Sequence, residues 1–185
     1  MRFDVLIYGR EELRRKATPV ARPDEAIRQL ASDMLETMYA QNGIGLAAEQ
    51  VGRLEAVCVV DVPPAQDAEE NGTQRSPDVK MPLVLVNPRI EETSGAQTGQ
   101  EGCLSFPEIF VPVKRAWEAT VSFMNLKGEE CRVRVRGLLA RAVQHEIDHL
   151  AGVLLVDRMT PVQRVAIAGR LKRLRKSARL RPAAG

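Results

Sequence analysis

Apolar residues recur at helical spacing near both ends of the chain. In residues 24–40 they lie mostly three or four positions apart, Asp24 precedes them as a candidate N-cap, and Asn42 and Gly43 follow them. A second set follows Pro161, which can open a helix as its first residue, and extends through residues 161–182. The pattern predicts an N-terminal and a C-terminal helix, with these apolar positions: Ile27, Leu30, Met34, Leu35 and Met38, then Ile167, Leu171, Leu174 and Ala178.

The chain between these segments predicts short strands. Residues 57–62 and 83–87 are rich in Val and Leu, which is typical of β-strands. Residues 119–126 and 130–135 alternate apolar and polar positions around Lys127-Gly128-Glu129, which predicts a β-hairpin.

Two glycine- or proline-rich stretches and one break-free stretch complete the pattern. We interpret residues 43–52 as a glycine-bounded loop and residues 63–82, which contain four prolines and Gly72, as a long exposed loop. Residues 137–150 predict a third helix that ends near Gly152. We therefore predict an α+β fold, with short antiparallel or mixed strands around this central helix and a helix at each end of the chain.

Both histidines of the chain lie in the predicted central helix, in the sequence His145-Glu146-Ile147-Asp148-His149. Side chains four positions apart lie on one face of a helix, about one turn apart. Two imidazoles placed in this way can bind one metal ion, and Glu146 is then placed to move a proton for a water molecule. Two ordinary histidines beside a carboxylate are the alternative, but the motif favours a metal hydrolase.

The composition is that of an ordinary globular protein, with 44% apolar and 28% charged residues in 185. No apolar run approaches the roughly 18–20 residues of a membrane helix, and the first residues lack the features of a secretion signal. The three cysteines are an odd number, which argues against a disulfide framework. We expect a single catalytic domain, residues 1–185, in the cytoplasm and without a membrane partner.

A catalytic metal site usually has three protein ligands, so one more Asp, Glu or Cys is needed. Downstream of the motif, Leu155 stands where an extended zinc motif has a histidine, and Asp157 is the one carboxylate. Upstream, Cys103 lies between a glycine-rich segment and Pro107, and a thiolate is a strong ligand for a borderline metal. The residues alone leave Cys103 and Asp157 open as the third ligand.

Three segments together resemble the motifs of the peptide deformylase family: GIGLAAEQ at 43–50, EGCLS at 101–105 and HEIDHL at 145–150. They occur in the family's order, and the resemblance extends to residues 5–9 and the closing helix. It implies a metal-dependent hydrolase that removes the N-formyl group from the N-terminal formylmethionine of newly synthesised polypeptides, with release of formate. It also implies Fe2+ as cofactor, one ion per chain, with Zn2+, Ni2+ or Co2+ as alternatives.

The resemblance also assigns roles to single residues. Cys103, His145 and His149 would bind the metal, and Glu146 would take a proton from the attacking water and pass it to the leaving amine. The Gln50 side chain and the Leu104 backbone N–H would stabilise the oxyanion. The resemblance further places Ile44, Gly45 and Gly102 beside the substrate backbone. For the methionine side chain our candidates are Ile44, Leu138 and Ala142, the last two on one side of the helix before His145; ordinary core positions are the alternative for all three.

One segment of this chain differs from the family's pattern, and the roles of two acidic residues have alternative interpretations. Residues 107–111 lack the arginine that contacts substrate in some family members, and Arg141 is expected to line part of the cleft. Asp148 either has a supporting role, in which it orients a ligand histidine or pairs with Arg115, or is a solvated helix residue, and Glu101 is open in the same way.

The end of the chain is strongly cationic. No acidic residue follows Asp157, whereas residues 158–181 include nine Lys or Arg side chains. This charge indicates either a solvated helix face or, given the resemblance, contact with ribosomal RNA where formylated chains emerge; we expect no DNA partner. Two other functions stay open: a metalloprotease with Asp157 as ligand, and a non-enzymatic RNA-binding module.

Overall fold

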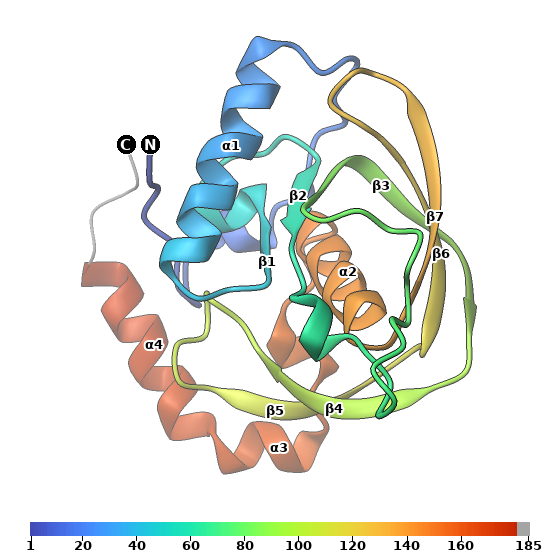
Figure 1. Ribbon diagram of the computed structural model, residues 1–185. Helices are drawn as coiled ribbons and strands as arrows, with labels where there is room; N and C mark the ends of the chain where they lie inside the picture. The colour runs from blue at the N-terminus through green and yellow to red at the C-terminus, as the bar shows by residue number, and fades with distance from the viewer. Residues whose placement is uncertain (181–185) are drawn as a thin grey trace.

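A five-stranded antiparallel sheet and a two-stranded sheet surround the helix that carries both histidines, as the computed structural model, described here for residues 1–180, shows in Figure 1. The large sheet has the order β1-β2-β3-β6-β7, and its strands are β1 (Gly45–Ala47), β2 (Val57–Val60), β3 (Leu83–Ser94), β6 (Glu118–Met124) and β7 (Glu130–Arg136). The small sheet pairs β4 (Gln97–Gly102) with β5 (Phe110–Arg115). The helices are α1 (Glu25–Ala40), α2 (Gly137–Leu150), α3 (Pro161–Ala166) and α4 (Ala168–Leu180).

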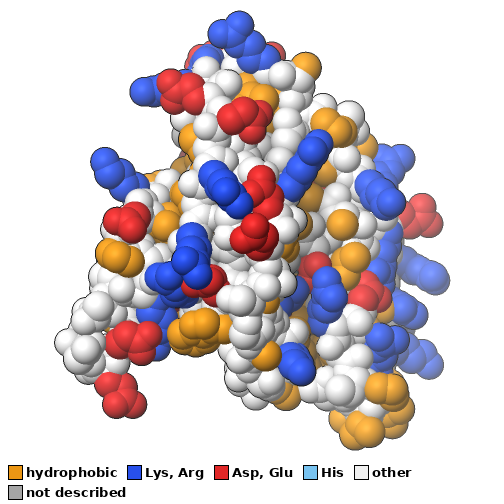
Figure 2. Space-filling model, turned by 90° about the vertical axis from the view of Figure 1, so that its right-hand side faces the viewer, with side chains coloured by type: hydrophobic (Ala, Val, Ile, Leu, Met, Phe, Trp, Pro, Cys, Tyr) orange, Lys and Arg blue, Asp and Glu red, His pale blue; other side chains and the backbone are white. Residues whose placement is uncertain are grey.

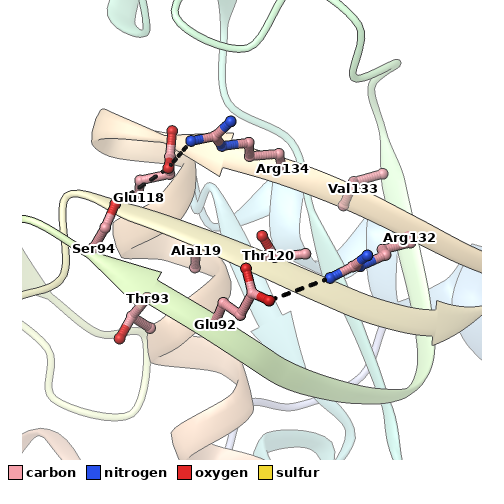
Figure 3. A pocket seen from close by; sticks show the side chains of 9 residues that line it. All are labelled: Glu92, Thr93, Ser94, Glu118, Ala119, Thr120, Arg132, Val133 and Arg134. Atoms are coloured by element: carbon pink, nitrogen blue, oxygen red, sulfur yellow. Dashed lines mark hydrogen bonds and ion pairs between the residues drawn. The ribbon is translucent and has the colours of Figure 1, made fainter.

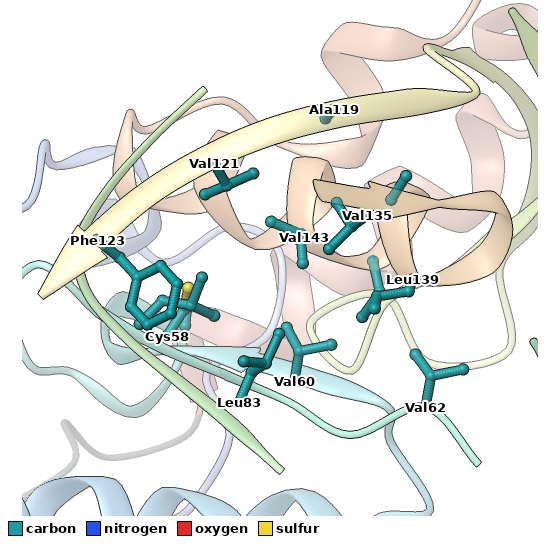
Figure 4. Close-up of a cluster of buried hydrophobic side chains, with 14 of the residues drawn as sticks. Cys58, Val60, Val62, Leu83, Ala119, Val121, Phe123, Val135, Leu139 and Val143 are labelled. Carbon is teal, nitrogen blue, oxygen red and sulfur yellow. The ribbon is translucent and has the colours of Figure 1, made fainter. Parts of the chain in front are cut away.

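Strand β2 is apolar throughout because both of its faces are buried. Successive side chains of a strand point to opposite faces. Val57 and Val59 accordingly pack in a cluster with Met34 and Met38 of α1. Cys58 and Val60 point the other way, into the cluster that includes Val143 of α2, and Figure 4 shows this second group. The sheet is thus held between α1 and α2.

A third apolar cluster fixes the small sheet. Val111 and Val113 of β5 pack with Phe106, with residues 154–156 and with Leu171 of α4. Strand β5 is therefore packed against the segment that follows α2 and against α4.

The predicted α+β class is confirmed, and α2 spans the residues that the sequence predicts. The interpretation of residues 43–52 as a loop was wrong. They form β1 and a 3-10 turn (Ala48–Val51), because Gly45–Ala47 pairs with β2 across the edge of the sheet. The small sheet was not anticipated. None of the helices within residues 1–180 is long and apolar enough to cross a membrane.

The predicted C-terminal helix of residues 161–182 is divided in two. Ile167 adopts a turn conformation between α3 and α4, and its side chain packs on the third apolar cluster. Residues 181 and 182 of the prediction lie outside the described part of the chain.

The loop of residues 63–82 caps the central helix. Arg136, at the N-cap position of α2, provides no side-chain cap. Asp67 of the loop instead accepts hydrogen bonds from the backbone N–H groups of Leu138 and Leu139, at 3.0 and 3.3 Å. Asp67 is only 5% exposed, so a segment expected to be fully solvated supports the helix that carries both histidines.

Candidate active site

Three predicted metal ligands lie together at the end of β4 and on one face of α2. Cys103 directly follows β4, and His145 and His149 are one turn apart on α2. Their ligand atoms lie within 4.8 Å of one another, and Cys103 Sγ is 3.3 Å from His149 Nε2. Within residues 1–180 this is the group whose spacing suits a metal ion.

Asp157 lies outside this group. Its carboxylate pairs with Arg14 and accepts a hydrogen bond from the backbone N–H of Leu154 at 2.8 Å. The alternative in which Asp157 is the third ligand therefore has no support from the geometry.

A buried carboxylate orients His145. Glu101 Oε2 lies 3.0 Å from His145 Nδ1, and both Glu101 oxygens accept hydrogen bonds from Arg115, at 2.8 and 3.0 Å. Burial opposes ionisation of Glu101, but the hydrogen bonds from His145 and Arg115 outweigh it and lower the pKa of this carboxyl. Arg115 also donates to Asp148 at 2.5 Å, so the predicted pairing of these two residues is confirmed.

The two histidines have opposite electrostatic settings. Burial, followed by the charges of His145 and Arg115, lowers the pKa of His149 well below its usual value. Burial also opposes protonation of His145, but hydrogen bonds with Cys103 and Glu101 raise its pKa. A metal ion binds neutral imidazoles, so a bound ion would compete with protonation of His145.

Glu146 is a buried carboxylate beside the ligand group. It is 4% exposed, and its Oε2 atom has no hydrogen-bond partner among the described residues. Burial is the main cause that raises the pKa of Glu146 to about 7. The carboxylate lies against Gly45, where an added Cβ would come within 2.8 Å of Glu146 Cδ. A side chain at position 45 would therefore collide with the carboxylate of Glu146, which explains the glycine.

Gln50 is fixed with its amide nitrogen toward Cys103. Its Oε1 accepts the backbone N–H of Ala47 at 2.9 Å. Its Nε2 donates to Ser105 Oγ at 3.1 Å and lies 3.5 Å from Cys103 Sγ. Both partners on the amide are buried, so the N–H₂ group is held in one orientation.

A cleft with a volume of about 560 Å³ opens onto this group. Its walls come from the β1 segment, the end of β4, the β4–β5 connection and α2. Arg141 lines it as predicted, but its guanidinium is buried and bound to Glu101 and to the Val113 carbonyl. The other predicted residues on its walls are Ile44, Gly45, Gln50, Gly102, Cys103, Leu104, Leu138, Ala142, His145 and Glu146.

A second hollow of about 510 Å³ lies on the outer face of β3, β6 and β7, and Figure 3 shows its side chains. Arg134 pairs there with Glu118, and Arg132 pairs with Glu92. Figure 2 shows the side of the molecule at the right of Figure 1, where Lys and Arg side chains are interspersed with Asp and Glu. The hollow is lined by mutually neutralised charges and holds none of the metal-ligand group, so we assign the chemistry to the cleft.

The sequence did not indicate that one acidic residue, Glu49, is buried. Glu49 is fully buried, and neither carboxylate oxygen has a partner among residues 1–180. Burial is the main cause that raises its pKa to about 8. Its neighbours Ala48 and Gln50 are also buried, but nothing in the local sequence separates Glu49 from a solvated loop residue.

The chain is similar to one protein family in sequence, and to solved structures in fold. Residues 3–165 match the family model described as "Polypeptide deformylase". A peptide deformylase from Alkalilimnicola ehrlichii is 45% identical over 178 residues, covering 96% of this chain and 93% of that protein. The crystal structure of a peptide deformylase from Legionella pneumophila has a TM-score of 0.81 and 35% identity, covering 98% and 100% of the two chains. A structure of the Synechococcus elongatus enzyme in complex with actinonin has a TM-score of 0.78 and 38% identity, covering 91% and 85%.

Proposed function

The chain belongs to the polypeptide deformylase family, and from that premise we propose how its residues remove the N-formyl group from newly synthesised polypeptides. The enzyme hydrolyses the amide bond of an N-terminal formylmethionine and releases formate. The observation that carries this proposal is the group of Cys103, His145 and His149 at a cleft, with the buried carboxylate of Glu146 beside it.

The ligand set suits a divalent metal ion. One thiolate and two imidazoles suit ions of borderline softness, which include Fe2+, Zn2+, Ni2+ and Co2+. Glu101 holds His145 through Nδ1, so its Nε2 atom is directed to the site, as is common for metal-bound histidines. We propose Fe2+ as the native ion. When bound, such an ion lowers the pKa of water and polarises a carbonyl oxygen.

Glu146 moves the proton. Its carboxylate faces the cleft beside the ligand group, and its Oε2 atom has no hydrogen-bond partner within residues 1–180. It takes a proton from the water that attacks the formyl carbon. It then delivers this proton to the amine nitrogen as the C–N bond breaks, which leaves formate and a free amino terminus. One carboxylate serves both steps because they are sequential.

Gln50 and Leu104 stabilise the oxyanion that forms on the formyl oxygen. The Gln50 amide is held by Ala47 and Ser105, so its N–H group is preorganised before substrate binds. The backbone N–H of Leu104 is the second donor. Removal of one such donor typically costs about 10²–10³ in rate.

The substrate peptide binds as an added strand. Strand β1 lies at the edge of the large sheet, where an extended peptide can pair with it, and Gly45 and Gly102 line the cleft beside this edge. The methionine side chain enters the apolar pocket of Ile44, Leu138 and Ala142, of which Ala142 is buried.

The basic C-terminal helices provide a second contact, which we propose is with ribosomal RNA in the cytoplasm. Of residues 168–180, six are Lys or Arg and none is acidic. Reversal of Arg173 and Lys176 to Glu is expected to reduce co-sedimentation with ribosomes at low salt, because phosphate contacts are electrostatic. Unchanged co-sedimentation would contradict this contact and leave the catalytic proposal intact.

Formate release from formyl-Met-Ala-Ser by anaerobically purified protein tests the function. We expect activity with about one metal ion per chain, and we expect Cys103→Ala to lose both the ion and formate release. Cys131→Ala is the matched control, because Cys131 lies on β7 outside the ligand group. A metalloprotease using Asp157 would keep its metal in Cys103→Ala, and an RNA-binding module would release no formate.

A further inference from the structure

Phe110 is an exposed aromatic ring on the wall of the cleft. Among the large apolar side chains that are exposed within residues 1–180, it alone lines the cleft, and it is 69% exposed. Burying such a ring against an apolar group is favourable, so the ring gains contact area when a ligand covers it. The catalytic scheme above gives Phe110 no role.

The ring lies one strand away from the metal-ligand group. Phe110 is paired with Gly102 in the small sheet, and Gly102 immediately precedes Cys103. A Cβ at Gly102 would lie 2.6 Å from Phe110 Cε1, so the ring packs across the bare Gly102 backbone. The cleft wall therefore continues without interruption from Cys103 to the ring of Phe110.

A peptide that extends through the cleft from Cys103 and His145 can reach this ring, because all three residues line the same cleft. Strand residues advance about 3.4 Å each, and paired strands lie about 4.8 Å apart. With the formyl group at Cys103, His145 and His149, the next residues of the substrate come within reach of a side chain on the neighbouring strand. The occupant of the Phe110 surface is thus the continuation of the peptide already in the cleft.

Resting on the deformylase function proposed above, we propose that Phe110 determines specificity. It selects substrates with an apolar or aromatic side chain at one of the first two positions after formylmethionine. The charges of the residues around the ring agree with a preference for apolar or aromatic substrate side chains. Gln41 and Asn42, which also line the cleft, are exposed and neutral. Glu108 is the exposed charged residue among those that line the cleft, and its carboxylate disfavours acidic substrates.

Steady-state kinetics on formyl-Met-Phe-Ser, formyl-Met-Ser-Phe and formyl-Met-Ser-Ser test the inference. For the wild-type enzyme we expect kcat/KM about three- to tenfold higher for one of the Phe peptides than for formyl-Met-Ser-Ser, the scale of an aromatic contact. Phe110→Ala should bring this ratio near one, mainly through KM, because the contact binds the ground and transition states alike. Phe110→Lys should favour Asp over Phe at the same position.

Val162→Ala is the matched control, because Val162 is equally apolar and exposed but lies on α3 away from the cleft walls. It should keep the wild-type ratio. A wild-type ratio near one at both positions, or a ratio that survives in Phe110→Ala, would overturn the inference while leaving deformylation established. If the metal-bound enzyme released no formate from any of these peptides, the proposed function would be contradicted. The inference would then be contradicted as well.

Discussion

Oε2 of Glu101 lies 3.0 Å from Nδ1 of His145, and both side chains are buried. The same carboxylate binds Arg115 through both oxygens and Arg141 through one. Glu101 therefore fixes the ring of a metal ligand from the second position before Cys103, so one short segment of chain holds two parts of the site.

Glu101→Gln should weaken metal binding. The amide keeps the size of the side chain but removes the charge that polarises His145 and compensates two arginines. Loss of such a partner typically lowers metal affinity about 10–100-fold. Competition with a chelator under anaerobic conditions measures the affinity, with Glu130→Gln, on the exposed part of β7, as control. Equal affinity in the two variants would mean that Glu101 does not hold His145.

Gly45→Ala should impair catalysis without removing the metal. The new Cβ would come within 2.8 Å of Glu146 Cδ, so the carboxylate must shift. A displacement of about 1 Å at a reacting group can cost about 10²-fold in rate. Formate release and metal content are measured together. Gly169→Ala on α4 is the control, because an added Cβ there meets nothing closer than 3.9 Å. Full activity of Gly45→Ala would show that Glu146 tolerates displacement.

Asp67→Ala should destabilise the protein by about 1 kcal/mol, the usual cost of losing a helix cap. The substitution leaves the N–H groups of Leu138 and Leu139 without their acceptor. Urea denaturation measures the change, and Asp78→Ala, which is exposed in the same loop, should have little effect. If both variants unfold at the same urea concentration as the wild type, the loop does not support α2.

Glu49 should make stability depend on pH. Its folded pKa of about 8 is raised above the value of 4.5 for a free glutamate. The folded state therefore retains a proton that the unfolded state loses. The stabilisation is complete below pH 4.5 and is lost as the pH rises through about 8.

Glu49→Gln removes this dependence. Its stability relative to wild type should improve as the pH rises from 5 to 8, with a slope of up to about 1.4 kcal/mol per pH unit. Denaturant unfolding at several pH values measures the slope, with exposed Glu70→Gln as control. Parallel profiles for Glu49→Gln and wild type would contradict a buried protonated acid.

The sequence predicted the parts of the molecule that depend on local pattern. Helix α1 begins after Asp24, which caps it by accepting the N–H of Ile27, and α2 has the bounds that its break-free composition indicates. His145 and His149 were predicted as ligands because their residue type and spacing restrict metal sites strongly, whereas Cys103 was preferred to Asp157 through the resemblance to peptide deformylases.

The features that were missed depend on distant partners. Strand β1 is three residues long and exists because β2 pairs with it. The cap of α2 comes from Asp67, about seventy residues earlier in the chain. Glu49 is buried by packing of the whole fold, and the ring of Phe110 reaches the cleft only because β5 pairs with β4. No local window of sequence contains these relationships.

X-ray absorption at the metal edge of the zinc-loaded protein tests the central claim most directly. We predict one sulfur ligand at about 2.3 Å and two imidazole nitrogens at about 2.0–2.1 Å, with the sulfur contribution absent in Cys103→Ser and retained in Cys131→Ser. A wild-type spectrum without sulfur, or one that Cys103→Ser leaves unchanged, would contradict the account.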